Sequence, residues 1–293
     1  MICSDCGLGR FEPMPDAATR LAFYPAEYYG LLGAKFQPFF ERLVRWLAAR
    51  HTALLTRGIP PGARVLDVGC GRGVMLGRLA DRGFEAHGVE LRPEALEGID
   101  PRVHVRVAPR LADAGYPDAH FDEVVFWHVL EHLDDPRGAL AAAHRWLKPG
   151  GRLVVAVPNH SSLQARLMGA AWFHLDPPRH LYHFPLPALE RLLCDVGFRI
   201  DSRHHFSLRQ NPFGWIQSLE NLSPRLPRNG LYALMYRRAS GGPLPFDART
   251  RFWLRLGLVI GAPFAVGASV LEAALRSGAT VHVLATRQEP GAR

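Results

Sequence analysis

The chain contains, at residues 65–73, the segment Val65-Leu66-Asp67-Val68-Gly69-Cys70-Gly71-Arg72-Gly73, which is the most informative part of the sequence about the fold. It joins a short apolar run, typical of a buried strand, to an acid and then to glycines at alternate positions. Backbone without side chains lets a ligand lie against the turn between a strand and a helix. The stretch therefore predicts a strand, a ligand-binding turn and a helix that runs through Leu79.

Two kinds of ligand suit such a turn. A dinucleotide loop requires Gly-x-Gly-x-x-Gly, and counted from Gly69 the third glycine would fall at Val74. The acid Asp67 would also repel a pyrophosphate, whereas it pairs well with the ammonium group of an amino-acid-like ligand. Spacing and charge therefore favour a cationic ligand, and an NAD-dependent oxidoreductase is the less favoured alternative.

Strand-like and helical stretches alternate on both sides of this turn. Further strands are predicted at residues 85–90, 103–107, 121–127, 151–157, 198–206 and 279–285, and helices at residues 34–55, 93–97, 136–147 and 186–196. This alternation predicts an α/β fold, a doubly wound Rossmann-like sheet with helices on both faces.

The same pass along the chain predicts its organisation. A Cys-x-x-Cys knuckle remnant occupies residues 1–20, an N-terminal helical lid 21–60, and the core 61–207. A partly helical apolar insertion at residues 208–278, read as a substrate cap, precedes the last core strand and tail at 279–293.

The composition is that of a folded chain with a sizeable core, at 293 residues and 48% hydrophobic. The net charge is +8, but the arginines are spread and form no basic tract, so we expect no nucleic-acid partner. An anionic membrane surface or an acidic substrate suits the same charge. The first residues do not read as a signal peptide, and the cysteines form no disulfide framework, so we expect a cytoplasmic location.

A second acid stands where a ligand of this fold needs one. Glu90 ends the second predicted strand, at about the distance from Gly69 where such folds hold ribose hydroxyls. The alternative is a solvated acid at the end of a strand.

Residues 65–73 resemble the first motif of class I S-adenosylmethionine-dependent methyltransferases, nearly position for position. Two further stretches agree: residues 121–133, Phe-Asp-Glu-Val-Val through His-Val-Leu-Glu-His-Leu, resemble the fourth-strand motif, and residues 147–151, Leu-Lys-Pro-Gly-Gly, resemble the turn before the fifth strand. The resemblance implies S-adenosylmethionine as cofactor. The cofactor-binding residues it implies are Asp67, Gly69, Gly71 and Gly73 for the methionine part, Glu90 for the ribose, Leu91 for the adenine, and His128 at the lip beside the cofactor.

Many relatives place an acid after the third strand, and residues 107–110 offer none. Asp113 lies nearby, but its register stays open. The adenine amine is therefore given no partner.

Both ends of the chain resemble a bacterial subgroup with a type 11 or type 23 methyltransferase domain and an N-terminal Cys-x-x-Cys knuckle. Its features here are the pair Cys3 and Cys6, the segment Tyr24-Pro-Ala-Glu-Tyr-Tyr29, and the segment Asp176-Pro-Pro-Arg-His-Leu-Tyr-His-Phe184. Two thiolates do not close a zinc site, so we expect an N-terminus that is disordered or free of metal.

The histidine-rich segment is the place to look for a general base, since histidine titrates near neutrality. His180 is the first candidate and His183 the second, although any one histidine is more often structural. His128-x-x-Glu131-His132 also resembles a Glu-x-x-Glu-His metal site proposed for some ubiquinone-pathway O-methyltransferases. The favoured interpretation is a lip beside the cofactor with no metal.

An apolar run at residues 256–271 lies between Arg255 and Glu272. It is too short to span a bilayer, and Pro263 is expected to interrupt a helix there. The alternatives are a buried hairpin over the sheet edge, an apolar partner-binding face, and peripheral membrane contact.

The sequence thus predicts methyl transfer from S-adenosylmethionine to a small-molecule, glycan or lipid-linked acceptor, in the cytoplasm or at the inner face of the membrane. The acceptor is expected between the loop at residues 172–183 and the insertion, with Trp172 and Trp215 as apolar walls and Arg179 facing an acidic group. A non-catalytic S-adenosylmethionine-binding or assembly module is the alternative, and the oligomeric state stays open.

Overall fold

The computed structural model describes residues 1–25, 42, 46, 52, 55–235 and 246–289. Most of the helix predicted at residues 34–55 lies outside these described residues, as does the part of the Tyr24-Pro segment after residue 25. The predicted lid at residues 21–60 is therefore described mainly at its two ends, and its role stays a prediction.

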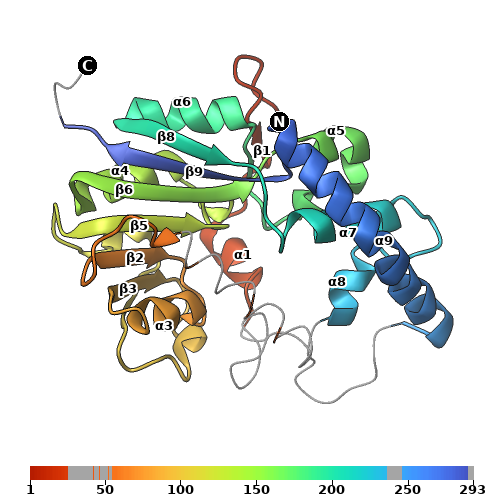
Figure 1. The fold of residues 1–293 in the computed structure, drawn as a ribbon, viewed down its shortest axis with the longest axis horizontal. Coiled ribbons are helices and arrows are strands. Elements are labelled where there is room, and N and C mark those ends of the chain that lie inside the picture. Colours follow the sequence, from red (N-terminus) through yellow and green to blue (C-terminus); the bar gives the residue numbers. More distant parts are fainter. Residues whose placement is uncertain (26–41, 43–45, 47–51, 53–54, 236–245, 290–293) are drawn as a thin grey trace.

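One sheet of seven strands, in the order β4-β3-β2-β5-β6-β9-β8, forms the centre of the molecule (Figure 1). Strands β4, β3, β2, β5 and β6 run parallel, and β9 is antiparallel to both of its neighbours. The strands are β2 (Arg64–Val68), β3 (Glu85–Glu90), β4 (His104–Val107), β5 (Phe121–Trp127), β6 (Leu147–Pro158), β8 (Phe198–His204) and β9 (Thr280–Arg287). The predicted α/β, doubly wound, Rossmann-like sheet is confirmed.

Helices cover both faces of this sheet. One face carries α3 (Val74–Ala80), and the other carries α4 (Pro136–Trp146) and α6 (Leu186–Val196). The helix predicted at residues 136–147 ends one residue early, because Leu147 pairs with Phe121 and opens β6. The shorter helices are η2 (Pro93–Leu96), η3 (Leu111–Ala114), η4 (Leu130–His132), α5 (Leu163–Met168), η5 (Gly169–Ala171) and η6 (Phe173–Leu175).

The central strands are apolar at successive positions because both of their faces are buried. Leu66 and Phe126 pack in the cluster beneath α4 and α6, whereas their chain neighbours Val65 and Val125 pack in the cluster beneath α3. Side chains of a strand alternate between faces, so a parallel strand with helices on both sides needs an unbroken apolar run. This is the pattern that identified the strands in the sequence.

Helices also fill the segment between β8 and β9. They are α7 (Asn211–Asn221), α8 (Gly230–Met235) and α9 (Ala248–Ala274), and they share an apolar cluster that includes Trp215, Leu231 and Leu254. In Figure 1 they stand beside the sheet, with α9 in dark blue along the outside.

The course of α9 corrects two expectations. It is one continuous helix of 27 residues, so the apolar run is not a buried hairpin, and Pro263 does not interrupt it. The ring of Pro263 faces outward, and the helix packs inward both before and after it, at Gly261 against Ile216 and at Ala265 in the cluster with Trp215. Packing of this kind offsets the one backbone hydrogen bond that proline removes.

The N-terminal residues lie over the same end of the sheet as the glycine loop at residues 69–73. Strand β1 (Gly9–Arg10) pairs with β7 (Tyr182–His183), so these residues are not disordered. Helix α1 (Ala17–Ala22) then lies just beyond the arrowheads of β2 and β5 (Figure 1). The guanidinium of Arg92, which follows β3, donates to the carbonyl of Leu21 and ties α1 to this edge.

Candidate cofactor and acceptor site

Three glycines shape the turn between β2 and α3. Gly69, Gly71 and Gly73 have φ values of +70°, +51° and +67°. Residues with a Cβ rarely adopt this left-handed conformation, so the alternate glycines are required by the turn itself.

The three positions differ in the space around them. A Cβ added to Gly69 would meet Val129 at 2.5 Å, and one added to Gly73 would meet Ile99 at 2.7 Å. A Cβ added to Gly71 would meet nothing within 4 Å. Gly69 and Gly73 therefore let the loop pack closely on its neighbours, and Gly71 has open space beside it.

Two acids face one another beside this loop. Asp67 at the end of β2 and Glu90 at the end of β3 are each only 5% exposed. Burial, and then the charge of Glu90, raise the pKa of Asp67 well above its ordinary range. Two carboxyl groups brought together in this way ionise together only when a positive charge lies beside them, so the pair favours a cationic ligand.

Glu90 also organises the backbone around it. Its carboxylate accepts hydrogen bonds from the backbone N–H of Gly71 at 2.8 Å and of Leu91 at 2.7 Å. The acid thereby joins the glycine loop to the turn after β3. The open loop and the paired acids fit S-adenosylmethionine, which carries both a sulfonium and an ammonium charge.

The adenine end is less complete. Leu91 is half-buried beside Glu90, consistent with an apolar contact. Asp113 lies in η3, where its carboxylate pairs with Arg110 at 3.1 Å and is exposed, so nothing in its setting favours a ligand-binding role. The described residues after β4 thus add no acid for the adenine amine.

His128 follows β5 in a strained conformation, with a φ of +55°. Its Nδ1 lies 3.3 Å from Oε1 of Glu131. Burial lowers the pKa of His128 to about 3, with a further lowering from the charge of Arg209. Its Nε2 and the Oε2 of Glu131 are buried and have no hydrogen-bond partner among the described residues. Non-glycine residues at positive φ often mark functional sites, and the two unsatisfied atoms leave hydrogen-bonding capacity beside the loop.

His180 lies next to this pair. Its Nδ1 is 2.8 Å from the carbonyl of His174, and the Nδ1 of His132 is 2.9 Å from the carbonyl of Arg179. Because a carbonyl only accepts, each Nδ1 carries the hydrogen and each Nε2 holds the lone pair. Burial lowers the pKa of His180 well below its ordinary value, so the ring is neutral near pH 7.

The ligating atoms of Glu131, His132 and His180 lie within 4.8 Å of one another. The spacing and the two neutral imidazoles are compatible with a divalent cation, since ligating histidines usually donate their other ring hydrogen to a carbonyl. The set differs from the one considered in the sequence, because His180 takes the place of His128. The prediction that no metal is bound stays a prediction.

His183, the second candidate base, is more loosely connected. Its ring centroid lies 6.3 Å from that of His180 and 5.5 Å from that of His160. Burial lowers its pKa to about 4. Strand pairing with Gly9 fixes its backbone, which gives His183 a structural role in β7.

One expectation about the acceptor site is wrong, and another stays a prediction. Trp172 is 1% exposed and donates its indole N–H to Gln164, and Trp215 is 8% exposed, so both indoles are core packing and not open walls. Arg179 donates to the carboxylate of Asp176 at 2.7 Å, and its pairing with an acidic group of the acceptor stays a prediction. The sequence around Trp172 and Trp215 does not indicate how deeply their side chains are buried.

Tyr24 was missed as a site residue. Its hydroxyl lies 2.9 Å from Nδ1 of His132, the nitrogen that also lies 2.9 Å from the carbonyl of Arg179. On the same side, Arg20 pairs with Asp134 at 2.6 Å. The co-occurrence of the Tyr24-Pro25 segment with the histidine-rich segment was the only signal in the sequence for this contact.

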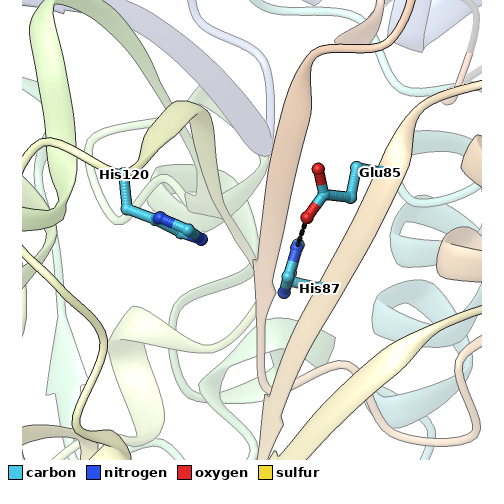
Figure 2. Close-up of side chains that lie close together, drawn as sticks. All are labelled: Glu85, His87 and His120. Atoms are coloured by element: carbon cyan, nitrogen blue, oxygen red, sulfur yellow. Dashed lines mark hydrogen bonds and ion pairs between the residues drawn. The ribbon is translucent and has the colours of Figure 1, made fainter.

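A second polar cluster lies at the opposite end of the parallel strands (Figure 2). Glu85 opens β3, His87 follows it, and His120 precedes β5, with ligating atoms within 4.8 Å of one another. Nε2 of His87 lies 2.9 Å from Glu85, whose other oxygen accepts from Arg64 at 2.9 Å. Because a guanidinium already neutralises the one carboxylate, the cluster is better explained as an ion-paired edge of the core than as a cation site.

Comparison with known sequences identifies the family. The sequence family described as "Methyltransferase domain" matches residues 39–203, more than half of the chain. The ubiquinone biosynthesis O-methyltransferase of Xanthomonas oryzae pv. oryzae is 33% identical over 132 residues, which cover 42% of this chain and 55% of that protein. The protein of the same name from Leptothrix cholodnii is 32% identical over 171 residues, which cover 54% of this chain and 72% of that protein. The chain spans about half the length of the first of these relatives.

Solved structures agree on the fold. A SAM dependent methyltransferase from Archaeoglobus fulgidus has a TM-score of 0.51 at 21% identity, covering 85% of this chain and 98% of that one. Phosphoethanolamine N-methyltransferase 2 of Haemonchus contortus, in complex with S-adenosyl-L-methionine, has a TM-score of 0.53 at 17% identity, covering 95% of this chain and 59% of that one. Together with the sequence matches, these likenesses establish that the chain belongs to the family of S-adenosylmethionine-dependent methyltransferase domains.

Proposed function

We propose that this chain transfers a methyl group from S-adenosylmethionine to a small-molecule acceptor in the cytoplasm. One observation carries the proposal: an open turn at Gly71 lies beside the buried acids Asp67 and Glu90. An opening lined by two acids suits a ligand with a net positive charge. The names of the curated relatives support a small-molecule acceptor and an oxygen as the methylated atom.

The residues around the loop divide the cofactor between them. Asp67 and the glycines Gly69, Gly71 and Gly73 hold the methionine part, Glu90 holds the ribose hydroxyls, and Leu91 packs on the adenine. His128, at the end of β5, closes the side next to the methyl group. When bound, S-adenosylmethionine supplies a methyl group activated by a positively charged sulfur.

His180 acts as the general base in this proposal. Its Nε2 lone pair takes the proton of the acceptor as the acceptor atom approaches the methyl group. The hydrogen bond from Nδ1 to the carbonyl of His174, at 2.8 Å, supports this tautomer. Because transfer from a sulfonium needs little further activation, positioning of the acceptor supplies much of the rate.

The acceptor is proposed to lie beyond the carboxyl edge of the sheet, between the 172–183 loop and the helices that follow β8. These two parts are in contact, since the ring of Phe173 lies 5.2 Å from Phe213 and 5.4 Å from Tyr232. The acceptor is a small molecule, and we place it among glycan or lipid-linked compounds. The support for this placement is the apolar surface of α9 on the same lobe.

Transfer of a tritiated methyl group tests the function. The purified chain is incubated with labelled S-adenosylmethionine and with fractionated cell extract, and the labelled product is identified by mass spectrometry. The expected result is label in one small molecule, lost in Asp67→Ala. Cofactor binding without transfer to any fraction would contradict the proposal and indicate a binding module instead.

A further inference from the structure

The outer face of α9 is apolar and exposed to an unusual extent. Among its side chains, Val259 is 71% exposed, Phe264 76% and Ile260 57%. No charged residue occurs between Arg255 and Glu272, and Glu272 itself is fully buried on the inner side. Soluble proteins rarely expose a continuous apolar surface of this size without a binding partner.

The inner face of α9 is fixed to α7. A Cβ on Gly257 would come within 2.7 Å of Glu220, and Ser269 and Glu272 are fully buried on the same side. The helix is 27 residues long, and its most apolar 18-residue window has a mean hydropathy of 1.8 and is 17% buried, which meets the length and composition of a membrane span. Crossing a bilayer would expose the buried acids Glu220 and Glu272 to hydrocarbon, so the contacts favour a helix that lies flat.

The segment of sequence that contains α9 is strongly basic. Residues 208–278 contain nine arginines, no lysine and three acids. Two of these acids, Glu220 and Glu272, are buried, which leaves Asp247 as the exposed one. The exposed arginines Arg249 and Arg255 lie at the N-terminal end of the apolar face, beside the exposed rings of Phe252 and Trp253.

We propose that α9 docks this protein on an anionic lipid bilayer, with the helix parallel to the surface. Val259, Ile260 and Phe264 enter the acyl region, while Arg249 and Arg255 contact acidic headgroups. Apolar burial and attraction to anionic lipid together are what hold an interfacial helix. The complementarity of arginines and acidic headgroups distinguishes this occupant from a second copy of the chain, whose own α9 would bring like charges together.

Vesicle co-sedimentation of the full chain tests the proposal. The protein is mixed at low salt with two kinds of vesicle. One contains phosphatidylcholine alone, and the other also contains about 30% phosphatidylglycerol as the anionic lipid. Binding is expected only to the anionic vesicles and is expected to weaken in high salt. Val259→Ser/Phe264→Ser should weaken it about 10-fold or more, and Arg249→Gln/Arg255→Gln should weaken it to a similar extent.

The matched control is Val107→Ser, which removes an exposed apolar side chain from β4, at the edge of the sheet. Its binding should equal that of the wild type. Absence of binding to anionic vesicles, or equal binding by the α9 variants, would overturn the proposal. So would a stable dimer in light scattering that Val259→Ser/Phe264→Ser dissociates, because α9 would then be an interface between copies.

Discussion

In the glycine loop at residues 69–73, Gly71 is the glycine with open space beside it, since an added Cβ would meet nothing within 4 Å. Gly71→Ala is expected to weaken S-adenosylmethionine binding at least 10-fold, because the new methyl group occupies space that the ligand needs. Gly58→Ala is the matched control, since Gly58 also has a positive φ, +80°, and nothing within 4 Å of the added Cβ. Both variants should lose about 1 to 2 kcal/mol of stability through backbone strain, and only Gly71→Ala should lose affinity in calorimetry.

An equal loss of affinity in both glycine variants would show that strain, and not the ligand space at Gly71, determines the effect. No loss in either variant would place the cofactor elsewhere.

His180 is the residue on which the proposed proton transfer depends. His180→Ala should lower turnover about 100-fold while leaving cofactor affinity nearly unchanged. Because the pKa of His180 lies well below its ordinary value, the ring stays in the basic form as pH falls from 8 to 6.5. Turnover of the wild type should therefore be nearly flat over this range.

Steady-state kinetics, with melting curves as a check on folding, measure the effect at His180. Unchanged turnover in His180→Ala would assign the residue to structure and move the role of base to His183 or His128.

The sequence predicted the site where local pattern was enough. The glycine spacing and the acids Asp67 and Glu90 all lie within one βαβ unit, so a short stretch of sequence is enough to recognise them. The contact of Tyr24 with His132 joins residues 108 positions apart, and no local pattern encodes it. The same holds for His180, whose neighbours are set by the packing of the loop and not by its sequence.

At the scale of elements, the α7–α9 interface contains an acid that burial keeps protonated. Burial raises the pKa of Glu220 to about 8. The native protein therefore holds a proton that the unfolded chain releases near pH 4.5, and the free energy of unfolding should fall as pH rises from about 4.5 to 8. Glu220→Gln should remove this fall and stabilise the protein by roughly 1 to 3 kcal/mol at pH 8.

Urea unfolding at pH 5.5 and pH 8 measures the effect at Glu220. The exposed Glu94 provides the control Glu94→Gln, which removes a carboxyl group from the surface instead of from the α7–α9 interface. A constant difference for Glu220→Gln would mean that Glu220 is ionised in the native protein.

Elements differ in how far the sequence predicted them. The strands were recognisable because both faces of the sheet are buried, but the antiparallel direction of β9 was not, since a strand pattern has no direction. The rule that proline interrupts helices failed at Pro263. The partner that holds α9 there, α7, is set by the tertiary fold.

For the whole molecule, charge and apolar surface gather on one lobe. The core around β2 and β3 carries the acids that suit a cationic cofactor, while the segment between β8 and β9, loops included, contains nine arginines and only three acids. The net charge of +8 indicated only that an anionic partner would suit this protein. Its concentration around α9 became visible once the fold was known.

Calorimetric titration with S-adenosylmethionine tests the central claim, that the loop after β2 and the acid after β3 form the cofactor site. Wild-type protein should bind one equivalent. Asp67→Ala and Glu90→Ala should each weaken binding by roughly 1 to 3 kcal/mol, the usual range for charge-assisted hydrogen bonds, while Glu94→Ala should bind as the wild type does. Unchanged affinity in both Asp67→Ala and Glu90→Ala would contradict the account.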